Sequence, residues 1–261
     1  MMKTLINKPY KYTFAFLLIL LIYLGNLKAQ DNYITLDKAN NEYTKGNYQN
    51  AIDLYLQIVK TGYEAPELYY NLGNAYFKSN SLPYAILYFE KAKKLNPTDE
   101  DIEYNIKVVN NKLIDKIDIV PELFYIRWWK AIYSQSSANG WALISIISLC
   151  IFLLLVAIYL FSYKMLLRKL GFSFSFVFLL ITLLALNFSF IQKRQSTNSN
   201  EAIVFSPSVS VKSSPDANSV DLFVIHEGIK VEITDNIGDW SEMKIANGSK
   251  GWIKKEEYQK I

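Results

Sequence analysis

Three long apolar stretches stand out in the pattern of hydrophobic and polar positions along the chain. The first, residues 12–27, is uncharged and follows a short segment that contains three lysines. Two later stretches, residues 141–163 and 170–191, carry no charged side chain, and each is long enough to cross a bilayer as a helix. Helices this apolar rarely fit inside a domain this small. We therefore predict two transmembrane helices, 141–163 and 170–191, joined by a loop at 164–169.

The first apolar stretch is short for a membrane span and has the length of the hydrophobic region of a secretory signal. Lys3, Lys8 and Lys11 precede it, and Ala29 supplies a small residue for cleavage. We expect a cleaved signal peptide over residues 1–29, with an uncleaved N-terminal anchor as the alternative. In both cases the segment that follows is exported.

The net charge of +4 hides an uneven distribution of basic residues. Residues 31–130 carry 12 basic and 14 acidic side chains, and residues 199–261 carry 7 basic and 10 acidic ones. The basic excess lies beside the apolar stretches, including three basic residues in the loop at 164–169, and basic loops are typically cytoplasmic. The outer flanks are basic as well, so the export signal decides the orientation. We predict both soluble regions on the periplasmic side of a bacterial inner membrane.

An aromatic segment precedes the first predicted span. The linker at 118–140 includes Trp128 and Trp129, next to Arg127 and Lys130. Amphipathic aromatic rings favour the headgroup region of a bilayer, so we expect an interfacial helix in this linker. Neither predicted span contains an acidic or basic residue, which argues against a transport path.

The region between the signal and the linker, residues 31–117, contains an internal repeat. Residues of matching type recur 34 positions apart, as Ala39 and Gly73 or Tyr43 and Phe77 do. Small residues let two helices approach closely, and large apolar residues fill the space around them. A period of this length with this composition is typical of stacked helix–turn–helix units.

These positions resemble the tetratricopeptide repeat (TPR), most strongly in the second copy with Gly73, Ala85 and Pro97. The resemblance implies an α-helical solenoid with repeats at about residues 32–65 and 66–99. About three repeats are normally needed for independent stability, so an array of two is short. Docking on the membrane or on a partner would supply the remaining contacts.

A further helix is predicted at about residues 99–113. Thr98 to Asp101 provide a capped start, and apolar residues follow near helical spacing. We expect this helix to cover the open end of the array.

In the TPR family, the first helix of each repeat lines a groove that binds peptides or protein surfaces. The resemblance places seven residues at groove positions: Asn40, Tyr43, Thr44, Tyr70, Asn74, Phe77 and Lys78. Asn40 and Asn74 recur at the same position, and asparagine is a poor former of helix interiors, which favours a contact with a partner. Alternatively, Tyr43 and Phe77 only pack against neighbouring helices.

After a polar linker at 192–200, residues 201–261 show short strand patterns with alternating apolar and polar positions. Asn247-Gly248 is a hairpin signal between the last two predicted strands, 241–246 and 250–253. Six strands are predicted: 202–205, 209–212, 220–226, 229–234, 241–246 and 250–253.

Together with Gly-Asp-Trp at 238–240 and Gly-Trp-Ile at 251–253, these strands resemble a bacterial SH3-like (SH3b) domain, a small all-β barrel. Related domains bind cell-wall peptides or act as docking modules. Trp240 and Trp252 are candidate groove residues, and we expect at least one of them in the barrel core. His226 is expected to be a strand or turn residue, since no nucleophile or oxyanion donor accompanies it.

The composition narrows the classes further. The chain has 261 residues and is 51% hydrophobic, too apolar for a disordered protein. One cysteine and one histidine exclude an intramolecular disulfide and a Cys/His zinc cluster. The acidic soluble regions remove support for nucleic-acid binding. We expect a multidomain membrane protein that is not an enzyme and needs no cofactor or metal.

The order of signal, TPR pair, aromatic segment, two spans and SH3-like domain resembles the Bat (Bacteroides aerotolerance) family over essentially the whole chain. The resemblance implies partners among membrane proteins with von Willebrand factor A domains, and a link to oxygen tolerance or envelope stress. Two hypotheses follow. The protein is an adaptor that binds protein partners through the TPR groove, or it is an envelope sensor that binds peptidoglycan through the SH3-like domain.

Overall fold

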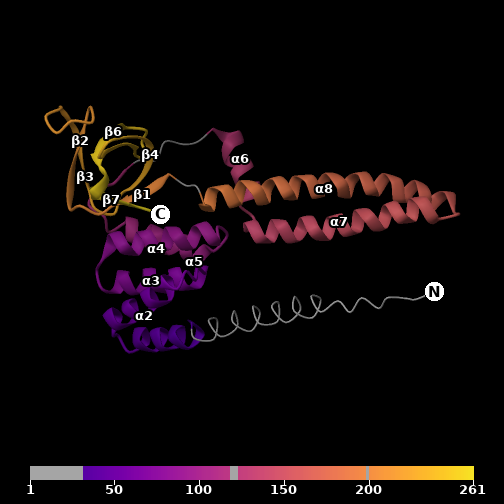
Figure 1. Cartoon of the computed structure of the whole chain (residues 1–261), viewed down its shortest axis with the longest axis horizontal. Coiled ribbons are helices and arrows are strands. Elements are labelled where there is room, and N and C mark those ends of the chain that lie inside the picture. Colours follow the sequence, from indigo (N-terminus) through magenta and orange to yellow (C-terminus); the bar gives the residue numbers. More distant parts are fainter. Residues whose placement is uncertain (1–31, 118–122, 198–199) are drawn as a thin grey trace, which may run out of the picture. The chain divides into compact units, whose positions relative to one another are not determined.

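The computed structural model describes residues 32–117, 123–197 and 200–261, whose elements are shown in Figure 1. The chain divides into two compact units, one ending at Glu64 and one spanning Ala65–Ile261. The predicted signal peptide lies outside the described residues, as do residues 118–122 of the aromatic linker.

The first unit is a helical hairpin. A helix over residues 32–44 is followed by α2 (Tyr48–Lys60). Gly46 lies between them with a φ of +84°, a left-handed conformation that glycine adopts at little cost. Ala39 and Ala51 are fully buried, so both helices present small residues to the core of the hairpin. This is the pattern that the 34-residue period predicted for the first repeat.

The second unit begins with three helices, α3 (Pro66–Lys78), α4 (Leu82–Leu95) and α5 (Glu100–Asn110). Proline occupies the first turn of α3 and of α4, where its missing N–H group costs nothing. Asp99 caps α5, because its carboxylate accepts hydrogen bonds from the backbone N–H groups of Asp101 and Ile102. α4 packs between α3 and α5, which places α5 where the capping helix was expected.

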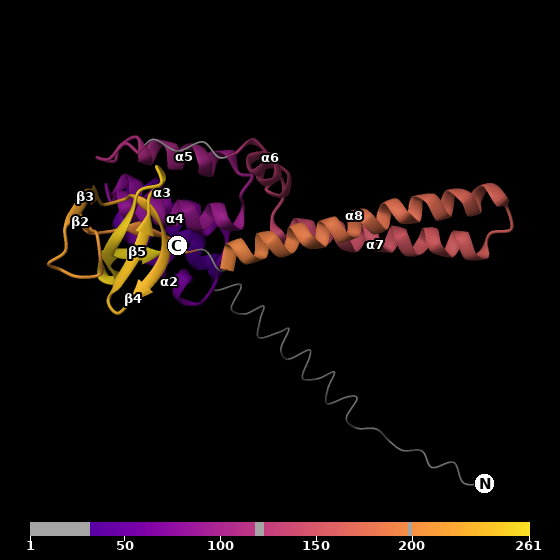
Figure 2. The same ribbon diagram turned by 90° about the horizontal axis from the view of Figure 1, so that it is seen from above.

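Two long helices follow a short aromatic one. α6 (Phe124–Tyr133) is the helix expected in the aromatic linker. α7 (Ala138–Phe161) and α8 (Met165–Thr197) pack against each other along their length as a hairpin, as Figures 1 and 2 show. Both are long and apolar enough to span a membrane, with few of their residues buried in the protein. The Trp141 indole donates a hydrogen bond to the Tyr133 carbonyl, which ties α6 to this hairpin.

The connection between α7 and α8 is shorter than the predicted loop at 164–169. Only residues 162–164 are non-helical, and α8 begins at Met165, so Arg168 and Lys169 lie in its first turns. The sequence 165–170 contains no glycine, proline or capping residue that would delay the helix. Arg168 and Lys169 are therefore carried by a helix end, whereas Lys164 remains in the connection.

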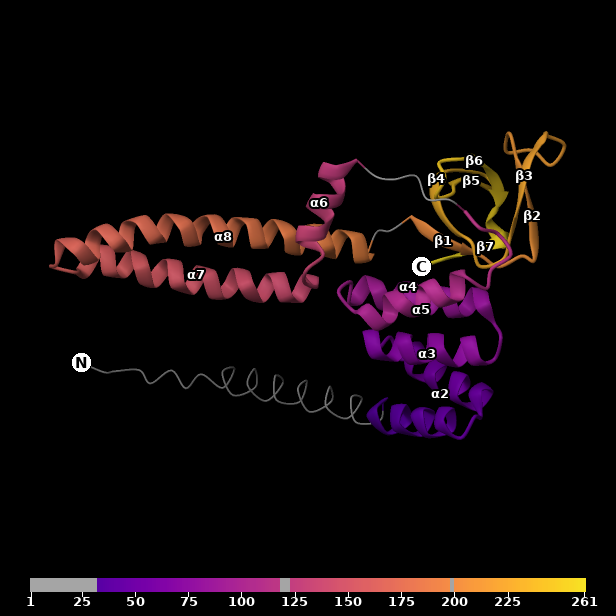
Figure 3. The ribbon, with the colours of Figure 1, turned by 180° about the vertical axis from the view of Figure 1, so that it is seen from behind.

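Seven antiparallel strands form one sheet with the order β3-β2-β6-β5-β4-β1-β7. Figure 3 shows this region from behind. Six strands lie where the sequence predicted strands, within a few residues at their ends. The seventh follows a short 3₁₀ helix, η1 (Lys255–Glu257), and was not predicted, because its three residues show no apolar alternation. The strands are β1 (Glu201–Val204), β2 (Ser208–Lys212), β3 (Asp221–His226), β4 (Lys230–Ile237), β5 (Trp240–Lys244), β6 (Lys250–Lys254) and β7 (Tyr258–Lys260).

Candidate functional site

The predicted groove residues of the first repeat make contacts inside their own hairpin. The Tyr55 hydroxyl donates a hydrogen bond of 2.6 Å to the side-chain oxygen of Asn40. Burial raises the pKa of Tyr55 to about 12, so the phenol stays protonated and keeps this donor. Tyr43 packs edge-on against Tyr48, with ring centroids 5.4 Å apart. Asn40 and Tyr43 therefore hold the two helices of the hairpin together, whatever else they bind.

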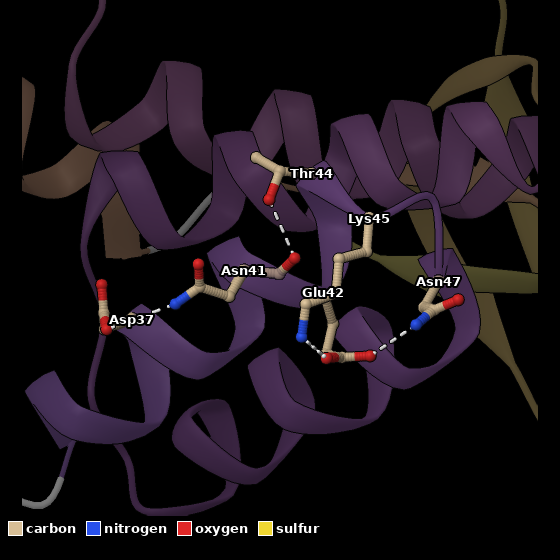
Figure 4. A network of polar contacts seen from close by, with 6 residues as sticks. All are labelled: Asp37, Asn41, Glu42, Thr44, Lys45 and Asn47. Atoms are coloured by element: carbon tan, nitrogen blue, oxygen red, sulfur yellow. Dashed lines mark hydrogen bonds and ion pairs between the residues drawn. The ribbon is translucent and has the colours of Figure 1, made fainter.

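Thr44 and Glu42 belong to a polar network on the exposed surface of the same hairpin, shown in Figure 4. The Thr44 hydroxyl donates to the Asn41 carbonyl of its own helix. The Glu42 carboxylate accepts hydrogen bonds from Lys45 and Asn47, at 2.9 and 2.8 Å, and these bonds lower the pKa of Glu42. A hollow beside the network is lined by charged and amide side chains of both helices.

The predicted groove residues of the second repeat face α5. The side-chain N–H group of Asn105 donates to the Asn74 oxygen at 3.0 Å and to the Tyr70 hydroxyl at 3.1 Å. All three side chains are only partly buried, so the polar cluster sits at the edge of the helix packing. Asn105 was not among the predicted site residues. The apolar residues at helical spacing around Asn105 predicted which face of α5 is buried. They gave no signal that Asn105 itself would contact α3.

The remaining two predicted residues of α3 lie at its C-terminal end. The Lys112 ammonium group lies over the Phe77 ring, 5.3 Å from the centroid, and leaves the ring half-buried. Lys78 is exposed. Within the second unit, the structure thus brings Tyr70 and Asn74 together through α5 and places Phe77 and Lys78 nearer the surface. Contact of a partner at these positions stays a prediction.

Trp240 and Trp252 share the outer face of the sheet, which differs from the expectation that at least one lies in the core. Trp252 pairs with Glu242, two residues from Trp240 on the same strand. Diagonal neighbours of this kind lie about 7–8 Å apart, within reach of two aromatic rings. Both indoles are half-buried, whereas Met243 and Ile253 fill the opposite face and are fully buried. The alternation of the strands places glycine, serine and aliphatic residues inside and both tryptophans outside.

His226 pairs with an acidic residue from the segment after α5. Its ring Nδ1 lies 2.9 Å from one Asp115 oxygen, and its backbone N–H group donates to the other at 2.7 Å. The histidine is thus a strand residue whose partner comes from another region of the chain. Within the described residues, no group of three or more His, Cys, Asp or Glu side chains is placed to hold a metal ion.

The fold and these surfaces define a helical-repeat interaction module joined to two apolar helices and an antiparallel sheet. Residues 36–100 match the tetratricopeptide repeat family. The protein therefore contains TPR repeats followed by a C-terminal seven-stranded antiparallel sheet. No curated protein matches the chain.

Proposed function

We propose that the protein is a non-enzymatic, membrane-anchored adaptor that binds partner proteins through the first helices of its TPR repeats. The observation that carries the proposal is the TPR match over residues 36–100, since TPR arrays act by binding peptides or protein surfaces. Two adjacent helices that are long and apolar enough to span a bilayer support the membrane anchor.

The proposal places both soluble regions on the periplasmic side of a bacterial inner membrane. The N-terminal basic and apolar pattern supports export, and the basic start of α8 supports a cytoplasmic turn. The resemblance to BatE of the Bacteroides aerotolerance operon supports partners among Bat membrane proteins with von Willebrand factor A domains. It also supports a role in oxygen tolerance or envelope stress.

Site-specific photocrosslinking in cells tests the binding surface. A photoreactive amino acid at Thr44 or Lys78 replaces an exposed side chain at a predicted groove position. Gln49 and Lys60 are matched control sites, because they are also exposed but lie on α2, the second helix of the first repeat. We expect discrete crosslinked proteins from positions 44 and 78 and none from 49 and 60. Equal crosslinking at all four positions would contradict binding through the first helices.

A cell-wall binding role through the C-terminal sheet is the second candidate function. The observation that favours it is the pair of half-buried indoles, Trp240 and Trp252, on the outer face of the sheet. Such rings provide large apolar contact area for a ligand. If this role holds, the detergent-solubilised protein sediments with purified peptidoglycan, and changing both tryptophans to alanine abolishes the sedimentation. A wild-type protein that stays in the supernatant would exclude this role.

A further inference from the structure

The middle of helix α4 is buried on every side, which two repeats and a capping helix do not explain. Six consecutive residues, Ala85–Glu90, are buried, and they cover more than one full helical turn. α3 and α5 pack against two sides of the helix. β1 of the C-terminal sheet contacts α4 as well, although more than 100 residues of chain separate the two elements.

A charged cluster lies at this contact. The Lys230 ammonium group is 2.9 Å from a carboxylate oxygen of Glu90 on α4 and 2.9 Å from one of Glu201 on β1. Burial alone would lower the pKa of Lys230, but the two carboxylates outweigh it and raise the pKa above its ordinary value. Glu90 is only 9% exposed and needs a charged partner there, since an unpaired buried carboxylate is costly.

Contacts on both sides of this cluster extend the interface along α4. Near the start of the helix, the ring of Tyr84 packs edge-on against Phe205, with centroids 4.7 Å apart. Near its end, the Lys94 ammonium group donates a hydrogen bond of 2.6 Å to the main-chain oxygen of Ile261. Burial lowers the pKa of Lys94, as expected for an amine enclosed at an interface. The sheet and the residues that adjoin β1 and β7 thus contact α4 near both of its ends and at its middle.

The segment after α5 continues the same interface. The Leu113 side chain packs so closely over Gly228 that a Cβ atom at Gly228 would lie 2.5 Å from it. Asp115 accepts the two hydrogen bonds from His226 described above. Leu113 is 8% exposed, and the turn between β3 and β4 covers part of its side chain.

We infer that the C-terminal sheet is the stacking partner of the second TPR repeat, covering the flank of α4 where a further repeat would otherwise pack. A helical-repeat array is stabilised by contacts between neighbouring units, and an array of two lacks one neighbour. The sheet provides that neighbour. The inference goes beyond the proposed function and does not depend on the identity of any partner.

The interface has a consequence for membrane topology. α7 and α8 lie between α5 and β1 in the chain, so two regions in direct contact must return to the same side of the membrane. The transmembrane hairpin then leaves from, and returns to, one composite soluble body. A partner that binds the second repeat is then held at a fixed position relative to the sheet.

Cysteine crosslinking in native membranes tests the inference on the full-length protein. The test variant carries Tyr84→Cys and Phe205→Cys with Cys150→Ser, and a bismaleimide reagent with a short spacer is the probe. The control pairs Tyr84→Cys with Ser214→Cys. Phe205 precedes β2, whereas Ser214 follows it. Strand β2 alone separates positions 205 and 214 by about 16 Å.

We expect a crosslink within one chain for the 84–205 pair, with a yield at least tenfold above the 84–214 pair. Mixing two differently tagged chains before the reaction distinguishes crosslinks within a chain from those between chains. Equal yields for the two pairs, or crosslinks only between chains, would overturn the inference.

The charged cluster is tested in the same assay. Glu90→Lys places a second positive charge beside Lys230, so we expect the 84–205 yield to fall at least threefold. Glu67→Lys is the matched control on the exposed start of α3 and should leave the yield unchanged. If Glu90→Lys fails to fold, Glu90→Gln removes the charge without adding volume and should lower the yield in the same direction. An unchanged yield in a folded Glu90 variant would overturn the role of the cluster in the interface.

Discussion

Gly73 offers the sharpest test of the repeat packing, because a side chain at this position has no room. An added Cβ atom would lie 2.7 Å from Cδ1 and 2.8 Å from Cε1 of Phe89. Favourable carbon–carbon contacts are about 3.5–4.0 Å, so helix α3 or the ring would have to move by nearly 1 Å. Phe89 is 1% exposed, and Leu72 and Ala85 are fully buried, which leaves the ring no free space to enter.

The opposing effects have different sizes. Overpacking a well-packed core typically costs about 1–3 kcal/mol, whereas replacing glycine in a helix interior by alanine recovers at most about 1 kcal/mol. Gly73→Ala should therefore be mildly destabilising, and Gly73→Leu should lose about 2 kcal/mol or more. A loss of about 2 kcal/mol corresponds to roughly thirtyfold faster exchange of protected amides.

Hydrogen–deuterium exchange of the full chain in detergent measures this effect. Peptides from α3 and α4 should exchange faster in Gly73→Leu, and peptides from α7 should not. The double variant Gly73→Ala with Phe89→Leu is the matched control, because the smaller side chain gives the new methyl group room. Its destabilisation should be less than the sum of the two single effects. Unchanged exchange in Gly73→Leu, or strict additivity in the double variant, would refute the close contact.

Four further outcomes are expected. The pKa of Tyr55 rises from 10.0 to about 12 on folding. The stability that the protonated phenol contributes to the first repeat should therefore be kept below about pH 10 and lost as the pH rises towards 12. Tyr55→Phe should remove that part of the pH dependence in denaturation curves. Asn105→Ala should cost about 1–3 kcal/mol, since two hydrogen bonds to α3 are lost, and should speed amide exchange in α5. Gly251→Ala should destabilise the sheet in thermal unfolding, because its Cβ atom would lie 2.9 Å from a carbonyl oxygen of β2. Ser148→Ala removes a 2.8 Å hydrogen bond to Thr182 between α7 and α8 and should cost only about 0.6 kcal/mol in detergent unfolding, within the range known for membrane helices.

The local pattern of the sequence determined most of the elements. The 34-residue period predicted the helices of two repeats, because small residues at Ala39, Gly73 and Ala85 mark close helix contacts whatever surrounds them. Charge-free runs of more than 20 residues predicted α7 and α8, because an apolar run of this length is typical of a helix that spans a bilayer. These signals depend on neighbours along the chain and survive without knowledge of the tertiary structure.

Two features of the candidate surfaces were decided only by the tertiary structure. The alternation of apolar and polar residues in β5 and β6 did not reveal which face of the sheet is buried. The expectation that at least one of Trp240 and Trp252 lies in the core was therefore wrong. The amide of Asn74 also bonds Asn105, 31 positions later, and no periodicity in the sequence signals that pair.

The contact of the sheet with α4 is the clearest case of tertiary determination. The charge of Glu90 is typical of an exposed position on α4, and Lys230 is one of several lysines in the sheet. The two residues are 140 positions apart in the sequence, and they pair because the chain folds back on itself. Sequence pattern reports which side chains are apolar along one element, whereas the identity of the element that covers a helix face depends on how the whole chain folds back.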